Sequence, residues 1–377
     1  MKIGIVVPGG VDRSGRERVV PALLWLIESI ARRHDLHVFV LDYYPEPCSY
    51  RLLGAAVHDL GAVGGVRGMR GLRRFSIRRR LSAALAIHGP FDVLHAYWGI
   101  AGIVTAWSSA RPGTSGTPVL VTCDSGEFVR CDDIDYGLQR RWVDRQAVRS
   151  MARAATTVTV PSQFMQRLAS SLGIEPVVVP VGVDVSRFPR VDRAEGPPWR
   201  LIRVASLNRV KDYPTLLRAL AHLVGQRQDV HLDIVGEDTL GGEVQAMADN
   251  LGLNPHVTFH GAQPTDRVSA LYARAHLNLV SSRHESANVT VLEAACTGLP
   301  TVGTSVGYVA DWAPGAAVAV PIQDPLALAA AVQRLLHDPQ ERARIAANAR
   351  AWAVAHDSEW TAHRFEQLYA DAVLTRR

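Results

Sequence analysis

The stretch 281–307 constrains the fold more than any other part of this 377-residue chain. An apolar run of strand length, 276–280, leads into it, and the segment 288–296 carries apolar residues at helical spacing on one side. Gly298 and Pro300 then end the helix, glycine as a left-handed cap and proline because it cannot continue the helical hydrogen bonds. The order strand, loop, helix, turn, strand is typical of a parallel α/β sheet.

Two carboxylates frame the helix of this stretch, Glu285 in the loop before it and Glu293 inside it. The helix N-terminus between them offers unpaired N–H groups and the positive end of a dipole, which favour a phosphate. A carboxylate one or two turns into the helix can accept hydrogen bonds from sugar hydroxyls. Helix capping and surface solvation are the alternative explanation for two such glutamates. Together with the flanking strands and glycines, the pair predicts a nucleotide-sugar pocket.

The same stretch resembles the signature of retaining glycosyltransferases of family 4, usually E-G-F-G-x-x-x-x-E-A-M-A-x-G-x-P. Five residues match it: Glu285, Glu293, Ala294, Gly298 and Pro300. At 286–288 this chain has Ser-Ala-Asn where the family commonly has Gly-Phe-Gly, and small residues are tolerable there because those positions act through backbone amides. The resemblance implies that Glu285 holds sugar hydroxyls, that Glu293 holds the ribose, and that the donor diphosphate binds at Ala287, Asn288 and Val289.

Length and composition indicate two domains, because 377 residues with 47% hydrophobic content can bury a large core. The resemblance implies the GT-B architecture, in which two Rossmann-like, doubly wound α/β domains face each other across a cleft. We expect an N-terminal acceptor-side domain over 1–190, a linker over 191–199 and a C-terminal nucleotide-sugar-binding domain over 200–355. A last helix within 356–377 is expected to pack back on the N-terminal domain.

Further donor contacts are expected in the segment 206–212, which resembles the family's G-R-L-x-x-x-K. In that motif the arginine and the lysine hold the donor diphosphate, which needs cationic partners. Lys211 matches the lysine, Ser206 stands where the family has arginine, and Arg209 is the nearby cation that could substitute. The resemblance therefore implies donor-binding roles for Ser206, Arg209 and Lys211.

The glycine loop after the first predicted strand, 2–7, lies where ligands bind in parallel sheets. It does not match G-x-G-x-x-G, and no acidic residue is placed as a dinucleotide site needs, so no NAD site is expected. The resemblance assigns Gly15 to the donor diphosphate, with Gly9-Gly10 as the competing register. It also implies backbone contacts to the donor base near Gly236, after the strand 231–235.

Acceptor-side residues are expected after two strands of the N-terminal half. The strand 91–95 leads to Trp98 and resembles the family's D-V-V-H-x-H, although a structural role is the alternative for His95. Asp124 stands where many relatives have the histidine of V-T-x-H-G; it can accept a hydrogen bond from a hydroxyl but cannot act as an imidazole. The predicted acceptor side is His95, Trp98 and Glu127, and the predicted catalytic set is Glu285, Lys211 and Asp124.

The net charge of +5 is carried almost wholly by arginine, with a cluster at 67–80 that contains no acidic residue. Such a cluster favours an anionic membrane surface over nucleic acid, because stacked aromatics and nucleic-acid motifs are missing beside it. A solvated helix face is the alternative. The cluster consists of Arg67, Arg70, Arg73, Arg74, Arg78, Arg79 and Arg80.

The four cysteines form no C-x-x-C pair and do not cluster with histidines along the sequence, so neither a disulfide framework nor a structural zinc site is expected. The first residues are too short for a signal peptide, and no apolar run approaches membrane-spanning length. We therefore expect a cytoplasmic protein with peripheral contact to the inner membrane face through 67–80.

These features predict a retaining, metal-independent hexosyltransferase without a cofactor. Its donor is expected to be a UDP- or GDP-linked sugar, and its acceptor the hydroxyl of a glycan, glycolipid or natural product, as in cell-wall or polysaccharide biosynthesis. Two alternatives stay open. One is an epimerase-type GT-B protein, and the other is a non-catalytic GT-B protein that binds sugar nucleotides, which is made credible by Ser206 and Asp124 in place of the family's arginine and histidine.

Overall fold

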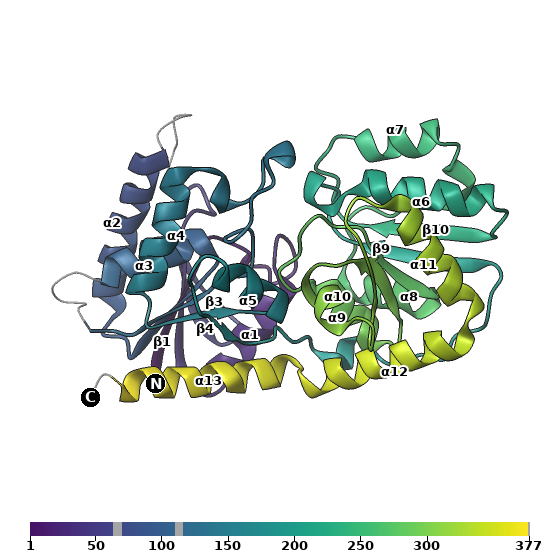
Figure 1. Ribbon diagram of the computed structural model, residues 1–377. Helices are drawn as coiled ribbons and strands as arrows, with labels where there is room; N and C mark the ends of the chain where they lie inside the picture. The colour runs from purple at the N-terminus through teal and green to yellow at the C-terminus, as the bar shows by residue number, and fades with distance from the viewer. Residues whose placement is uncertain (63–69, 110–115, 376–377) are drawn as a thin grey trace. The chain divides into compact units, whose positions relative to one another are not determined.

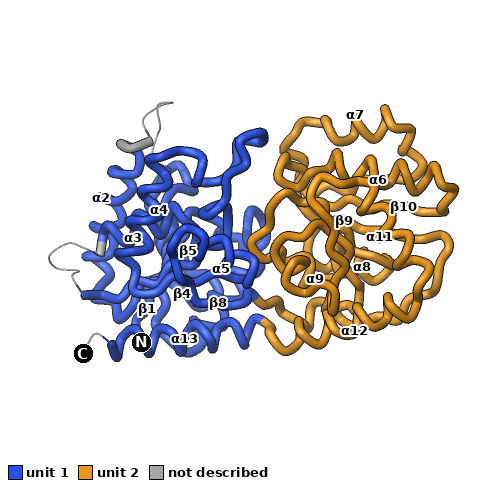
Figure 2. The backbone as a smooth tube through the Cα atoms, viewed as in Figure 1, with its two compact units in different colours: residues 1–181, 358–377 blue, residues 182–357 orange. Residues whose placement is uncertain are grey.

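The chain forms two compact α/β units in the structure, which is a computed structural model that describes residues 1–62, 70–109 and 116–375. Unit 1 consists of Met1–Val181 and Ser358–Arg377, and unit 2 is Gly182–Asp357 (Figure 2). The chain thus leaves unit 1 at residue 181 rather than near residue 190, and the proline-rich segment 191–199 lies inside unit 2. Arg193 explains this placement, since its guanidinium donates to the carbonyl oxygens of Thr297 at 3.0 Å and Gly298 at 3.1 Å within unit 2.

Unit 1 is built on an eight-stranded sheet with the strand order β3-β4-β2-β1-β5-β6-β7-β8. All neighbours are parallel except the hairpin of β3 and β4. The order reverses beside β1, which creates a switch point where ligands bind at the carboxyl ends of the strands. The strands are β1 Lys2–Val7, β2 Asp35–Val40, β3 Cys48–Leu52, β4 Ala55–Asp59, β5 Val93–Tyr97, β6 Val119–Thr122, β7 Thr157–Val160 and β8 Val177–Val178.

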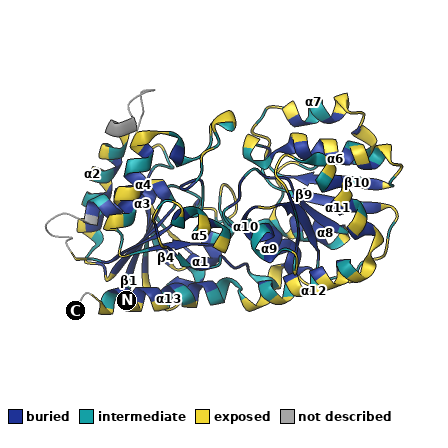
Figure 3. Cartoon of the chain, viewed as in Figure 1, coloured by how far each residue is buried: buried dark blue, intermediate teal, exposed yellow. Residues whose placement is uncertain are grey.

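Helices cover both faces of this sheet (Figure 1). One face packs on α1 (Pro21–Ala31) and on α13 (Ser358–Leu374), whose Phe365 and Tyr369 are wholly buried there. The opposite face packs on α2 (Arg70–His88), α3 (Gly99–Ser109), α4 (Trp142–Ala154) and α5 (Gln163–Ser170). The strands consist mostly of buried residues (Figure 3), and their apolar side chains belong to the clusters of both layers, as expected for a parallel sheet buried on its two faces.

Unit 2 is built on a wholly parallel six-stranded sheet with the order β11-β10-β9-β12-β13-β14. The order reverses between β9 and β12, so the loops after these two strands meet at one edge. The strands are β9 Trp199–Val204, β10 Val230–Val235, β11 Val257–Phe259, β12 Leu277–Val280, β13 Thr301–Thr304 and β14 Val318–Val320. The helices are α6 Tyr213–Gly225, α7 Glu243–Asn250, α8 Thr265–Arg274, α9 Val289–Cys296, α10 Gly307–Trp312, α11 Pro325–His337 and α12 Pro339–Ala355.

The predicted unit at 281–307 is present in this sheet as a loop, α9, a turn and β13. Gly298 has a φ of +75°, the left-handed conformation expected of a helix-terminating glycine. Asn288 precedes α9 with a φ of +77°. This explains why the family's glycine can be replaced here, since asparagine tolerates the left-handed region better than other residues with a side chain. In the described part of the chain, no helix is both long and apolar enough to span a bilayer.

Candidate functional site

The loops after β9 and β12 bring Lys211 and Glu285 together at the switch point of unit 2. Nζ of Lys211 donates to both carboxylate oxygens of Glu285, at 2.8 Å each. Two further bonds tie the loops to each other: Oγ of Ser281 donates to the carbonyl oxygen of Lys211 at 2.7 Å, and the N–H of Arg283 donates to that of Val210 at 2.8 Å. Asn208 also caps the short turn at Lys211, accepting from its N–H at 3.2 Å. The two predicted residues therefore form one fixed pair.

Glu285 is held ionised although only 7% of it is exposed. Burial on its own would raise the pKa of this carboxyl. The positive charges of Lys211 and Arg203, with hydrogen bonds from Lys211 and Ser282, outweigh burial and lower the pKa below its ordinary value. The carboxylate is consequently an acceptor for hydroxyl groups over the whole neutral range.

Arg203 is the site residue that the sequence analysis missed. It lies in β9 with no exposed area, and its Nη2 lies 3.5 Å from Oε1 of Glu285. The same Nη2 donates to Oγ of Ser282 at 2.7 Å, while Nη1 donates to the carbonyl oxygen of Leu279 at 3.3 Å. The sequence did contain a signal for this residue, an arginine inside an apolar strand. A buried guanidinium needs an anionic partner, so such an arginine indicates a nearby buried carboxylate. Arg203 gives Glu285 a second cation that is shielded from solvent.

Glu293 lies in α9 against Tyr272 of α8 and is 8% exposed. Oη of Tyr272 donates to Oε2 of Glu293 at 3.1 Å. Burial raises the pKa of Glu293 to about 7, and the hydrogen bond from Tyr272 opposes that rise only in part. A ligand that donates hydroxyl protons would favour the ionised form. The carboxyl is thus suited to accept from a diol such as a ribose once it is deprotonated.

The N-terminus of α9 is shaped by its neighbours rather than by a side-chain cap. The carbonyl oxygen of Ala287 accepts from the N–H of Tyr308 at 3.0 Å, and Oγ1 of Thr290 donates to Oδ1 of Asn288 at 2.7 Å. Asn288 and Val289 are partly exposed, whereas Ala287 is buried. The first turn of α9 therefore presents backbone N–H groups beside the pair of Lys211 and Glu285, the arrangement that suits a phosphate.

Three other predicted donor residues lie outside this cluster or are already engaged. Arg209 has a 61% exposed side chain whose Nη2 lies 3.5 Å from Oε1 of Glu243, so it is directed toward α7. Oγ of Ser206 accepts from Nδ2 of Asn208 at 3.2 Å. The N–H of Gly236 donates to the carbonyl oxygen of Gly261 at 2.9 Å and is used within the sheet.

Gly15 belongs to unit 1 and shapes the loop after β1. Its φ is +64°, and its N–H donates to the carbonyl oxygen of Asp12 at 2.9 Å. The carboxylate of Asp12 accepts from Oη of Tyr44 at 2.7 Å, from the N–H of Ser14 at 2.9 Å and from Nη2 of Arg18 at 2.9 Å. Gly15 thus occupies a rigid turn.

A cavity of about 430 Å³ lies in unit 1 at the carboxyl ends of β5 and β6. Glu127 is at its base, 1% exposed, and accepts from the N–H groups of Gly99 at 2.7 Å and Ser125 at 2.8 Å. Burial raises the pKa of Glu127 despite these bonds. Asp124, one residue before Ser125, is half-buried. The wall combines aromatic and charged side chains: Trp98, Asp135, Tyr136, Arg140, Arg141 and Asp144.

His95 does not fit the acceptor-side role predicted for it. It is wholly buried in β5, and its Nδ1 and Nε2 share hydrogen bonds with Tyr369 at 2.6 Å and Thr122 at 2.7 Å. Burial lowers its pKa to about 3. His95 is therefore a neutral structural residue that joins β5 to α13 and β6, and its sequence pattern could not reveal the burial.

The arginine-rich segment is largely engaged in contacts within unit 1. Arg67 lies outside the described residues, and only the backbone of Arg70 is described. Four others contact α4, the loop after β4, α3 and the loop after β2. Their partners are Asp144 for Arg74 at 2.7 Å, Leu60 for Arg80 at 2.9 Å, Trp107 for Arg78 at 2.7 Å, and Asp42 for Arg73. Four of the seven arginines therefore have partners within unit 1, Arg79 is exposed, and contact of this segment with a membrane stays a prediction.

Two family models and several curated relatives match this chain. The family model described as "Glycosyl transferases group 1" matches residues 185–352, and "Glycosyl transferase 4-like domain" matches residues 19–182. The D-inositol 3-phosphate glycosyltransferase of Corynebacterium urealyticum is 30% identical over 350 residues, 84% of this chain and 81% of that protein. A GDP-mannose-dependent alpha-(1-6)-phosphatidylinositol monomannoside mannosyltransferase of Mycolicibacterium smegmatis is 32% identical over 236 residues, 56% of this chain and 61% of that protein.

A solved structure supports the fold independently. Sucrose-phosphate synthase from Thermosynechococcus elongatus matches with a TM-score of 0.84 at 19% identity, covering 100% of both chains. The two sheets thus define a GT-B fold, as predicted. The chain belongs to the group 1 family of glycosyltransferases and transfers a sugar from a nucleotide-sugar donor with retained configuration.

Proposed function

We propose that this glycosyltransferase moves a hexosyl group from a UDP- or GDP-linked donor to a hydroxyl of a phosphorylated polyol, either free or as a lipid head group. The observation that carries the proposal is the unit 1 cavity, where Arg141 lines the same space as Trp98 and Tyr136, beside Arg140, whose guanidinium is paired with Asp132 and Asp135. Guanidinium groups recognise phosphate, and aromatic faces suit the apolar face of a ring. Two relatives that act on inositol phosphate or a phosphatidylinositol mannoside point to the same acceptor chemistry.

On the donor side, we propose that Lys211 turns from Glu285 to the donor diphosphate. Its side chain is 22% exposed, so Nζ can reach a ligand, while Arg203 stays with Glu285 and preserves its charge. Lys211 and the N-terminal N–H groups of α9 then stabilise the charge that develops on the leaving diphosphate. Glu285 holds hydroxyls of the donor sugar, and Glu293 holds the ribose. Because cationic and N–H groups neutralise the diphosphate, the reaction needs no metal ion.

The transfer itself breaks the bond from the anomeric carbon to the diphosphate oxygen and forms a bond from the same carbon to the acceptor oxygen. The acceptor proton passes to the leaving phosphate oxygen, and the incoming group approaches the face that the diphosphate leaves. The configuration is therefore retained, and the chemistry depends on leaving-group stabilisation more than on a strong protein base. Asp124 and Glu127 are assigned to the acceptor hydroxyls.

The test is an acceptor comparison in the presence of EDTA, with UDP-glucose, UDP-N-acetylglucosamine and GDP-mannose as donors. Each donor is offered myo-inositol, inositol monophosphate, and vesicles that contain phosphatidylinositol. We expect transfer to at least one phosphorylated acceptor and at least a tenfold lower kcat/KM for myo-inositol. Transfer only to the vesicles would identify the lipid-linked source. Equal use of myo-inositol, or conversion of a donor without any acceptor, would contradict the proposal.

A matched pair of variants tests whether the acceptor phosphate binds in the unit 1 cavity. Arg141 lines the cavity, whereas Arg149 is an exposed arginine farther along α4. We expect Arg141→Ala to raise the acceptor KM about tenfold without changing the donor KM, because one charge-assisted bond contributes about 1.5–3 kcal/mol. Arg149→Ala should leave both constants unchanged. An equal rise of the acceptor KM in both variants would show that the net charge of the protein, rather than a contact in this cavity, determines acceptor binding.

A further inference from the structure

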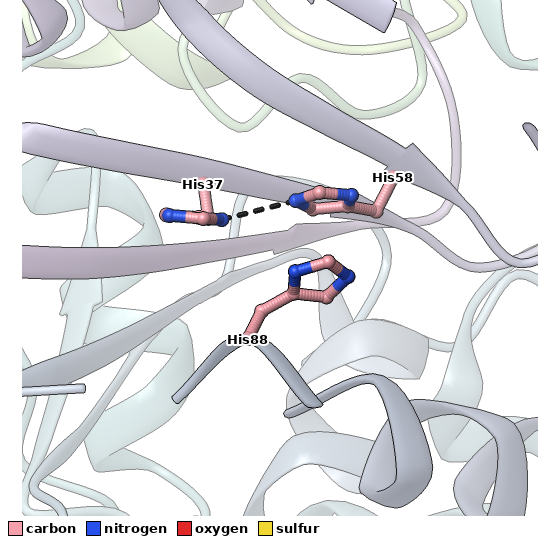
Figure 4. Close-up of side chains that lie close together, drawn as sticks. All are labelled: His37, His58 and His88. Atoms are coloured by element: carbon pink, nitrogen blue, oxygen red, sulfur yellow. Dashed lines mark hydrogen bonds between the residues drawn. The ribbon is translucent and has the colours of Figure 1, made fainter. Parts of the chain in front are cut away.

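Three histidine side chains converge in the layer between the sheet of unit 1 and α2, apart from the residues assigned to transfer. They are His37 of β2, His58 of β4 and His88, the last residue of α2 (Figure 4). One ring nitrogen of each lies within 4.8 Å of one nitrogen of each of the others. The three residues are widely separated in the sequence and match no short metal-binding motif, which is why the sequence did not reveal them.

The strand register explains why the first two meet. In the parallel pair of β2 and β4, His37 lies opposite Ala56, and His58 lies opposite Phe39. His37 and His58 therefore occupy one face of the sheet on a diagonal, because side chains alternate along each strand. The carboxyl end of α2 crosses the same face and places the ring of His88 at 3.8 Å from that of His58, centroid to centroid.

The hydrogen bonds around His37 and His58 resemble those of a metal site, in which a second residue holds each histidine ligand by its other ring nitrogen. Nδ1 of His37 faces Nε2 of His58 at 3.0 Å. The opposite nitrogens have their own partners: Nε2 of His37 lies 3.5 Å from Oδ1 of Asp35, and Nδ1 of His58 lies 3.1 Å from Oγ of Ser49. A metal-bound histidine characteristically directs its second nitrogen to a carboxylate or another oxygen, which fixes the ring and its tautomer.

The distance between the first two rings also suits coordination. Two Zn–N bonds of about 2.1 Å at a tetrahedral angle hold their nitrogens roughly 3.4 Å apart, close to the spacing of His37 and His58.

The surroundings provide an apolar wall and an opening. The ring of Phe39 lies 5.2 Å from that of His58, and the ring of Phe91 lies 5.5 Å from that of His37. The side chain of His37 is 14% exposed, so an ion can enter from solvent. A stack of imidazoles that share one hydrogen bond is the competing explanation, and it predicts no metal affinity.

We propose that His37, His58 and His88 bind one first-row divalent transition metal ion, with Zn²⁺ as the best match and water as the fourth ligand. Three neutral imidazoles are a usual donor set for such ions. The ring of His88 must tilt from its stacked position to direct a lone pair at the ion. The ion would fasten the end of α2 to β2 and β4, and it would stabilise unit 1 without taking part in sugar transfer.

The experiment uses the full chain without a polyhistidine tag, stripped with a chelator and then titrated with Zn²⁺ against a chromophoric competitor. We expect one equivalent of zinc to bind and the thermal midpoint to rise. Co²⁺ should give the visible absorption bands of a tetrahedral nitrogen-rich site. Less than about 0.2 equivalents of zinc in the stripped wild type would overturn the proposal.

Substitutions identify the ligands. His88→Gln and His37→Gln replace partly exposed side chains, so both variants should stay folded, which circular dichroism without metal checks. Each should weaken zinc binding at least tenfold, whereas His337→Gln, a change at an exposed histidine at the end of α11, should not. Wild-type affinity in both cluster variants would contradict the site. Transfer activity is measured in EDTA, so a failure here leaves the proposed function untouched.

Discussion

At the scale of single residues, Glu285 contacts two cations that differ in accessibility. Lys211 is partly exposed and Arg203 is wholly buried, and both lie within ion-pair distance of Oε1 of Glu285. In the function that we propose, the donor diphosphate draws Lys211 away while Arg203 keeps the carboxylate ionised and in place. Without the buried arginine, the departure of Lys211 would leave an unpaired charge in a desolvated site, which is costly.

Lys211 and Arg209 can be distinguished by a matched pair of substitutions. We expect Lys211→Ala to lower kcat at least 100-fold, because removing one group that stabilises developing charge costs about 2.7–4 kcal/mol in comparable sites. Arg209→Ala should change kcat less than threefold, since its side chain is directed to Glu243. Steady-state kinetics with a saturating donor measure both. A larger loss in Arg209→Ala than in Lys211→Ala would reverse the assignment.

Glu293 predicts a specific pH dependence of stability. Its pKa is raised from 4.5 to about 7 in the folded protein, so the folded state holds a proton that the unfolded state has lost between these values. Stability should therefore fall as the pH rises from about 4.5 to 7, by at most about 3 kcal/mol from this group. Urea unfolding of wild type and Glu293→Gln across this range measures it. A constant difference between the two proteins would show that Glu293 does not titrate there.

Sequence reasoning predicts Lys211, Glu285 and Glu293 as site residues because their spacing follows a recognisable pattern. The structure brings the first two into direct contact and buries the third in α9. Arg203 escaped notice because its partners come from β12 and the loop after it, and such long-range pairing leaves no local trace. His95 was misjudged for the same reason, since Tyr369, which shares its hydrogen bond, lies 274 residues away.

At the scale of elements, Gly236 at the end of β10 fixes the position of the loop that carries Lys211. It has a φ of +152°, and a Cβ at this residue would lie 2.0 Å from the carbonyl oxygen of Ala205 and 2.8 Å from the backbone nitrogen of Ser206. Both contacts are with backbone and cannot be relieved by a rotamer change. The loop after β9 can therefore keep its path only if residue 236 has no side chain.

The corresponding prediction compares two glycines. Gly236→Ala should reduce stability by more than about 2 kcal/mol and weaken donor binding, because strain and displacement act together. Gly225→Ala, at the exposed end of α6 where a Cβ meets nothing within 4 Å, should be neutral or stabilising. Urea unfolding and donor titration of both variants provide the comparison. Equal effects of the two substitutions would contradict the close approach at Gly236.

The elements themselves were predictable to different degrees. The unit at 281–307 follows from periodicity and its glycine and proline stops, and the structure confirms it as α9 and β13. The hairpin of β3 and β4 was not predicted. Its first strand, Cys-Ser-Tyr-Arg-Leu, alternates between partly buried and exposed residues at a sheet edge and so carries no apolar run.

At the scale of the whole molecule, the chain completes unit 1 only with its last helix. Phe365 and Tyr369 of α13 have no exposed area, and Glu359 accepts from Oγ of Ser29 at 2.7 Å and from Nη2 of Arg32 at 2.5 Å. One face of the first sheet is therefore covered by a helix that is separated in the sequence from the rest of unit 1 by the whole of unit 2. The family resemblance predicted that a helix within 356–377 packs back on the N-terminal domain, and in the structure Ser358–Arg377 belongs to unit 1.

Removing α13 should therefore affect the two units differently. A chain that ends at Asp357 should lose the cooperative unfolding of unit 1, while unit 2 remains folded because it contains none of the removed residues. Limited proteolysis with mass spectrometry distinguishes the units, and cleavage is expected within 1–181. Full protease resistance of 1–181 in the truncated chain would contradict this account of α13.

The most direct measurement of the central claim is calorimetric titration of the full chain with UDP-, GDP- and dTDP-sugars, with and without EDTA. We predict one binding site, selective for the sugars of one base, with an affinity that EDTA does not change and that Lys211→Ala weakens at least tenfold. Absence of binding by every donor, or binding that EDTA abolishes, would contradict a metal-independent donor site at Lys211 and Glu285.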